Sequence, residues 1–263
     1  MFHAVGDRMV HSVSFGSGSG TLVGVAGSFA NWEIWAPTFE LLSPRWRVVG
    51  FDHDGVGQTK VPLEDISTER HVETLLSVLD AQHVDRCVVA GDSANAAVAI
   101  EAVLRAPDRF DGLVVVNGHA WGFDRPEVRR FIEALRTQFE PTLDFFVELV
   151  FPEPDVDHLK QWLRDIIVRT GAEAAARIVE ANLGVDLRPR LGGVDLPALV
   201  IHGALDALSP TAMDDAAALA AALPRGELRL LDDAGHLPLL SRPVAVAAEL
   251  DAFLAANAHA DAP

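Results

Sequence analysis

Short apolar runs alternate with longer segments of helical periodicity along most of the chain. Six runs are predicted to be buried strands, at residues 21–26, 47–52, 87–91, 112–118, 198–203 and 227–233. Apolar strands separated by helices are typical of a parallel sheet covered by helices on both faces. Residues 15–20 lack a phosphate-loop pattern and precede a strand, so we interpret them as a turn after an N-terminal hairpin-like pair. The predicted fold class is α/β, with a mostly parallel central sheet.

The alternation stops between residues 125 and 182, where four helical segments follow one another without a strand. Prolines, among them Pro141, separate these segments, because proline is favoured at helix starts. Inserted after the sixth strand, the helices are expected to form a lid over the strand ends. We therefore predict a core of residues 1–120 and 191–263, interrupted by a helical lid at residues 121–190.

The acidic balance of the chain narrows the choice of partners. Its 263 residues include 21 Lys and Arg against 38 Asp and Glu, a formal charge of −17. Because Lys and Arg supply most phosphate affinity, we expect no nucleic acid, and a small neutral or weakly polar ligand. Cys87 is the only cysteine and is interpreted as an inert core thiol. Without a membrane-length or signal-like apolar run, the expectation is a cytoplasmic monomer or homodimer that uses no metal or other cofactor.

Ser93 lies in the segment GDSAN, directly after a buried strand and before an alanine-rich helix. A serine at such a join is typical of a nucleophile elbow, although serine is also a common helix cap. A nucleophilic serine needs a base, and the base needs a carboxylate to orient it. Asp206 and His236 each follow a later strand and complete a candidate triad. Taken alone, Asp206 could cap a helix and His236 could be a surface histidine, and Asp232 or Asp233 could compete as the acid.

Two backbone N–H groups are predicted to form an oxyanion hole, which stabilises the charge that develops when serine attacks a carbonyl. One belongs to Ala94, directly after the nucleophile, and the other to Ser28, in the loop after the first buried strand. Ala26 stands where many hydrolases carry a loop-bracing histidine, and Asn95 where the elbow pattern has glycine. For Asn95 we favour simple tolerance of a modest side chain over a hydrogen bond to a neighbouring loop.

Aromatic residues recur in the predicted lid at helical spacing, which indicates ordinary packing more often than a ligand pocket. If the lid covers Ser93, some of them line an enclosed and mainly apolar cavity. The candidate pocket residues are Phe29, His119, Phe139, Phe145, Phe146 and Trp162, and Phe151 is a further candidate.

Three motifs in combination resemble those of the α/β-hydrolase superfamily. GDSAN matches GxSxG except at its last position, FDHDGVGQT resembles the DxxGxGxS/T loop, and GHLPLLSRP resembles the GHxPxxxxP segment with the catalytic histidine. The resemblance covers essentially the whole chain and is closest to the branch of bacterial stress-signalling hydrolases and plant karrikin and strigolactone receptors. It implies an α/β-hydrolase fold with a four-helix lid, a triad of Ser93, Asp206 and His236, and oxyanion donors at Ser28 and Ala94.

These observations predict a serine hydrolase of the esterase or lactonase type. It is expected to cleave a small, mainly apolar carboxylic ester or lactone through an acyl-serine intermediate. A ligand receptor or regulatory protein with the same pocket is one alternative, and a carbon–carbon bond hydrolase or lyase with the same triad is another. Dehalogenase and epoxide-hydrolase chemistry is not expected, because it uses Asp as the nucleophile and Asp92 precedes the turn.

Overall fold

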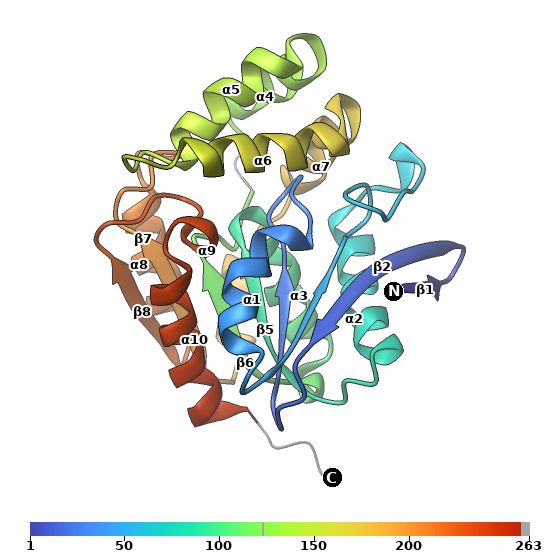
Figure 1. Cartoon of the computed structure of the whole chain (residues 1–263), viewed down its shortest axis with the longest axis vertical. Helices are drawn as coiled ribbons and strands as arrows, with labels where there is room; N and C mark the ends of the chain where they lie inside the picture. Colours follow the sequence, from blue (N-terminus) through green and yellow to red (C-terminus); the bar gives the residue numbers. More distant parts are fainter. Residues whose placement is uncertain (123, 259–263) are drawn as a thin grey trace.

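One β-sheet runs through the structure, a computed structural model that describes residues 1–122 and 124–258. The strands in these residues are β1 Phe2–Val5, β2 Arg8–Phe15, β3 Thr21–Val25, β4 Arg47–Phe51, β5 Cys87–Asp92, β6 Phe110–Val116, β7 Ala198–Gly203 and β8 Gly226–Leu231. Their spatial order is β1-β2-β4-β3-β5-β6-β7-β8 (Figure 1). β2 pairs antiparallel with β1 and β4, and the other neighbouring strands are parallel. The predicted fold class and hairpin are confirmed, and five of the six predicted buried strands are buried. The prediction is wrong for β8, because this strand lies at the edge of the sheet and its residues are half-buried or exposed.

The central strands are buried on both faces because their residues are apolar on both faces. Along β5, Val88 and Ala90 belong to one core cluster, whereas Cys87 and Val89 belong to the other. This is the alternation that a strand imposes on successive side chains. The edge strand β8 instead alternates between half-buried and exposed residues. The sheet centre is therefore the most rigid place from which to position a site.

Helices cover both faces of the sheet, as the alternating pattern predicted (Figure 1). Residues of α1 and α10 join the core cluster on one face, and residues of α2, α3 and α8 join the other. The bounds of these helices are α1 Ala36–Leu42, α2 Thr68–Ala81, α3 Ala96–Arg105, α8 Ala212–Ala222 and α10 Pro243–Asn257. A short helix, α9 Pro238–Ser241, precedes α10.

Between β6 and β7 lies a layer of helices, here called the helical insertion. It consists of α4 Pro126–Thr137, α5 Phe139–Val150, α6 Asp157–Thr170 and α7 Ala172–Asn182. Figure 1 shows these helices lying across one end of the sheet. The helices match the four predicted segments, but α5 begins at Phe139, before Pro141. Proline fits there because N–H groups in a first helical turn have no intrahelical partner.

The two chain segments that connect the helical insertion to the sheet, here called its stem, lie beside each other. Trp121 and Asp186 form an isolated antiparallel bridge. Beside it, the Gly122 N–H donates a hydrogen bond to the Val185 carbonyl at 2.6 Å. The two chain segments that enter and leave the insertion are therefore paired backbone to backbone.

Candidate active site

Ser93 occupies a tight turn between β5 and α3. Its φ of +53° lies in the left-handed region, which costs a non-glycine residue about 1–2 kcal/mol. Gly91 allows the turn to close, because a Cβ at that position would lie 2.6 Å from the Cα of Ala96. The Ser93 hydroxyl hydrogen-bonds His236 and caps no helix. The half-buried Ser93 is therefore held on a tight turn at the carboxyl end of β5, as predicted for a nucleophile elbow.

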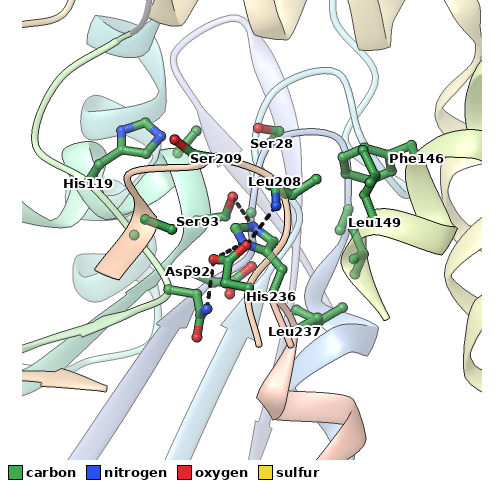
Figure 2. Close-up of a pocket in the computed structure, with 18 of the residues that line it drawn as sticks. Ser28, Asp92, Ser93, His119, Phe146, Leu149, Leu208, Ser209, His236 and Leu237 are labelled. Atoms are coloured by element: carbon green, nitrogen blue, oxygen red, sulfur yellow. Dashed lines mark hydrogen bonds and ion pairs between the residues drawn. The ribbon is translucent and has the colours of Figure 1, made fainter. Parts of the chain in front are cut away.

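A chain of hydrogen bonds links Ser93 to His236 and Asp206 (Figure 2). The Ser93 Oγ lies 2.9 Å from His236 Nε2, and His236 Nδ1 lies 2.8 Å from Asp206 Oδ2. An ionised carboxylate only accepts hydrogen bonds, so Nδ1 of a neutral His236 carries the proton and Nε2 can accept one from Ser93. The partner of His236 is Asp206, and not Asp232 or Asp233.

Neighbouring groups hold Asp206 and His236 in this geometry. Asn117 Nδ2 donates to Asp206 Oδ2 at 2.9 Å, and the Leu208 N–H donates to Oδ1 at 3.0 Å. The His236 N–H donates to the carbonyl of Val150 in the helical insertion at 3.0 Å. Asp206 is therefore held against His236 and does not cap α8, and the insertion helps to place the histidine.

The charge states of Asp206 and His236 support each other. Burial alone raises the pKa of the Asp206 carboxyl, but the His236 charge and three hydrogen bonds outweigh it and hold the pKa below its ordinary value. Burial lowers the pKa of the His236 imidazole, but the Asp206 charge and hydrogen bond, with the charge of Asp92, raise it above its ordinary value. His236 is thus a stronger base than an isolated histidine, as proton transfer from serine requires.

The loop after β3 approaches the Ser93 turn closely. A Cβ on Gly27 would lie 2.4 Å from Asp92 Oδ2 and 3.0 Å from Ser93 Cβ, so glycine is needed for this approach. Asp92 accepts a hydrogen bond from the backbone of Gly27. Ser28 and Ala94, the predicted oxyanion donors, both line the cavity beside Ser93.

Asn95 ties this loop to the start of α3. Its side chain is fully buried, and Nδ2 donates a hydrogen bond to the Ala26 carbonyl at 2.8 Å. The interpretation that Asn95 is merely tolerated is therefore wrong, because its amide reaches the neighbouring loop. The two departures from the family motifs are linked, since Asn95 braces the loop in which Ala26 replaces the usual histidine.

A cavity of about 400 Å³ opens onto Ser93. Four of the predicted pocket residues line it: Phe29, His119, Phe145 and Phe146. Phe139 and Trp162 do not; they are partly buried and pack against the core cluster beneath the helical insertion. Phe151 is fully buried and also outside the lining. The prediction is corrected for these three residues: the helical phase of Phe139 and Trp162 directs them to the packing between elements, and Phe151 is buried just after the end of α5.

A sequence profile described as the alpha/beta hydrolase family matches residues 22–249, from β3 into α10. The chain belongs to the α/β-hydrolase family. This membership agrees with the sheet order and with the position of Ser93 after β5, and it supports a hydrolytic role.

Relatives of this α/β-hydrolase include esterases and a lactonase. It is 30% identical to the pimeloyl-[acyl-carrier protein] methyl ester esterase of Nitrosomonas europaea, over 89% of this chain and 95% of that protein. It is 24% identical to a strigolactone esterase of Pisum sativum, over 91% and 94% of the two chains. The enol-lactonase of Burkholderia xenovorans has a TM-score of 0.88 and 25% identity, with 97% and 100% coverage. The plant branch predicted from the motifs is thus among the relatives.

Sequence reasoning missed several residues that this α/β-hydrolase brings to the site. Asn117 and Asp92 carried a usable signal, because polar residues at the ends of adjacent parallel strands meet at one sheet edge. Both contact the site directly: Asn117 donates to Asp206, and Asp92 accepts from Gly27. Other missed lining residues, among them Phe131, Leu149, Ser209 and Asp215, had no local signal and depend on how the loops and helices pack.

Metal-binding clusters, membrane-spanning helices and cavity-lining Lys or Arg are absent from the residues that the structure describes. In residues 1–122 and 124–258, no group of three or more His, Cys, Asp or Glu side chains is arranged to hold a metal ion. No helix in those residues combines the length and hydropathy needed to cross a membrane. Within the same residues, neither Lys nor Arg lines the cavity, whereas Asp92, Glu127, Asp206 and Asp215 do. Within these residues, a ligand in the cavity therefore meets acidic side chains and neither Lys nor Arg.

Proposed function

We propose that the protein is a serine hydrolase that cleaves a small, mainly apolar carboxylic ester or lactone through an acyl-serine intermediate. The observation that carries this proposal is the hydrogen-bonded chain from Ser93 through His236 to Asp206. The esterase and lactonase names of the relatives support the same reaction class.

In the proposed reaction, Ser93 Oγ attacks the carbonyl carbon while His236 Nε2 takes its proton. Asp206 stabilises the imidazolium, and the N–H groups of Ser28 and Ala94 stabilise the oxyanion. Collapse of the tetrahedral intermediate breaks the ester bond, and His236 returns the proton to the leaving alcohol. A water molecule then attacks the acyl-serine with His236 as the base, which releases the acid and regenerates the Ser93 hydroxyl.

The cavity supports an apolar substrate. The rings of Phe29, Phe131 and Phe146 meet there, with centroids 5.2–6.4 Å apart. We propose that the helical insertion acts as a lid, because residues of α4 to α7 line the cavity opposite Ser93. Exclusion of water by such a cover strengthens the electrostatic interactions on which the proposed oxyanion hole depends.

The test is turnover of short 4-nitrophenyl esters by the wild-type protein and by Ser93→Ala. We expect Ser93→Ala to lower the rate by on the order of 10⁵–10⁶-fold, because the nucleophile is removed. The fold should be unchanged, since only one hydroxyl is lost and no core volume. Ser43→Ala is the matched control, because the Ser43 hydroxyl bonds a carbonyl at the end of α1, outside the cavity.

Retention of more than a tenth of the activity by Ser93→Ala, with circular dichroism unchanged, would refute the nucleophile assignment. Stable ligand binding without measurable turnover by the wild type would instead favour a receptor. Intact-mass analysis after brief reaction with the ester separates these outcomes, because only the proposed hydrolase adds an acyl group to Ser93.

A further inference from the structure

The two sides of the cavity differ in chemistry. Figure 2 shows Ser93 and His236 in the middle, with Phe146 and Leu149 on one side and His119 on the other. The apolar side continues into the aromatic rings of the helical insertion. The polar side, defined here as His119, Ser209 and Asp215, is formed by the loops after β6 and β7 and the first turns of α8. A molecule that spans Ser93 therefore meets two different environments.

A relay of hydroxyl groups leads to the Asp215 carboxylate on the polar side. Thr211 Oγ1 donates to Asp215 Oδ2 at 2.8 Å, and Ser209 Oγ lies 3.1 Å from Thr211 Oγ1. Because the Thr211 hydroxyl proton is donated to the carboxylate, the Ser209 hydroxyl is the donor in the bond to Thr211 Oγ1. The Thr211 N–H donates to Ser209 Oγ at 3.3 Å, which fixes that side chain further. Ser209 Oγ and the other carboxylate oxygen of Asp215 therefore keep lone pairs for further hydrogen bonds, and both residues line the cavity.

No cationic side chain in the described residues forms an ion pair with the Asp215 carboxylate. Burial lowers the pKa of the His119 imidazole to about 4, so the ring is uncharged at neutral pH. Across residues 1–122 and 124–258, neither Lys nor Arg forms an ion pair with Asp215. Arg188 lies close enough to Asp215 for their charges to interact, but its guanidinium hydrogen-bonds the Asp186 carboxylate. The polar side thus combines hydroxyl and carboxylate acceptors with a negative charge that forms no ion pair with Lys or Arg in the described residues.

We propose that the polar side binds a hydrogen-bond-donating group of the substrate, an ammonium in preference to a hydroxyl. The substrate class is then an amphiphilic ester whose apolar part occupies the aromatic side and whose donor group reaches Ser209 and Asp215. An acceptor that loses its water when the substrate covers it needs a donor in return, whereas a methyl group in the same place leaves it unpaired. This inference rests on the proposed hydrolase function and names the substrate class for the same site.

The test uses rigid esters that cannot attack themselves, in two series. Methyl benzoates and benzyl acetates carry an ethyl, hydroxymethyl or aminomethyl group at the para position, and hydrolysis is followed in a pH-stat at pH 7. The benzoates carry the para group on the acyl part of the ester, and the benzyl acetates carry it on the alcohol part. In the series whose para group reaches the polar side, we expect kcat/KM to rise about tenfold from ethyl to aminomethyl, with hydroxymethyl between them. Equal or better hydrolysis of the ethyl ester in both series would overturn the proposal.

Asp215→Asn and Thr211→Val test the assigned residues. Each should reduce the aminomethyl-to-ethyl ratio of kcat/KM at least threefold, the first by removing the charge and the second by breaking the relay. Asp214→Asn is the matched control, because Asp214 is the exposed neighbour on α8 and lies outside this cavity. An unchanged ratio in Asp215→Asn would also overturn the proposal.

Failure of the hydrolase function can be distinguished from failure of the polar side. If no ester is cleaved and Ser93 is not acylated, the proposed function fails, and binding of the product-like alcohols is measured by calorimetry instead. Tighter binding of 4-(aminomethyl)benzyl alcohol than of 4-ethylbenzyl alcohol, lost in Asp215→Asn, would still support the donor site. No such difference would refute it.

Discussion

The hydrogen bond from Asn95 to the Ala26 carbonyl connects the nucleophile turn to the loop that carries one proposed oxyanion donor. Donors of this kind act only when they are held in place, and small displacements in an active site can cost about 10²-fold in rate. We expect Asn95→Asp to lower kcat about 10–100-fold at pH 8 with little change in KM, because a carboxylate cannot donate to Ala26. Asn95→Gly, which adds no repulsion, should stay within about tenfold of wild type.

Steady-state kinetics across pH separate this positioning role from a structural one. The deficit of Asn95→Asp relative to wild type should shrink as pH falls, because a protonated carboxyl can again donate to the carbonyl. A deficit that is constant with pH, or a change confined to thermal stability, would argue against a positioning role for Asn95.

At the level of elements, apolar periodicity was a sufficient guide to the strands and helices. The sheet centre is buried on both faces, so its strands appear as continuous apolar runs that few other structures produce. Ser93, Asp206 and His236 could be proposed because Ser93 directly follows a strand, the other two lie in the loops after later strands, and parallel strands end at one sheet edge. A hydrogen bond from Asn95 to a neighbouring loop was one of two alternatives, and the sequence could neither decide between them nor identify Ala26 as the partner, because no strand-end pattern marks this pair.

The helical phase of the insertion was the least predictable feature of the elements. Phe139 and Phe146 lie on the same helix, yet only Phe146 faces the cavity. Which face of an amphipathic helix meets a ligand depends on how neighbouring helices pack, and a single helix with aromatics on several positions does not encode that choice.

The stem of the helical insertion provides a test at this scale. A Cβ on Gly122 would lie 1.8 Å from the Asn182 carbonyl oxygen, whereas one on Gly184 would meet no atom within 4 Å. We expect Gly122→Ala to reduce the free energy of unfolding by about 1–3 kcal/mol, because the paired segments must separate. Gly184→Ala should change it by less than about 0.5 kcal/mol. Calorimetric unfolding of the two variants checks this contrast, and equal effects would contradict the close packing of the stem.

For the molecule as a whole, Asp92 links stability to pH. Its burial raises the pKa of the carboxyl to about 7, while the His236 charge and the Gly27 hydrogen bond oppose the shift. The folded protein therefore holds a proton that the unfolded chain releases, and stability is lost as pH rises from about 4 to 7. Asp92→Asn removes this loss, so we expect its stabilising effect to be on the order of 2–3 kcal/mol larger at pH 8 than at pH 5.

Urea denaturation of wild type and Asp92→Asn at the two pH values measures this difference. Asp214→Asn serves as the control, because that exposed carboxylate should leave the pH dependence as in wild type. The same stability difference at pH 5 and pH 8 would show that the Asp92 carboxyl does not retain its proton in the folded protein.

The attachment of the helical insertion to the body bears on how ligands enter and leave. Apolar residues of the insertion and of α1 and α10 form one continuous cluster, and Thr170 Oγ1 also donates to the Phe29 carbonyl at 2.9 Å. Swinging the whole insertion away would expose that shared interior to water. Phe145, by contrast, lines the cavity while 64% exposed. We therefore expect ligands to enter and leave by rotation of exposed lining side chains such as Phe145, which occurs far faster than domain opening.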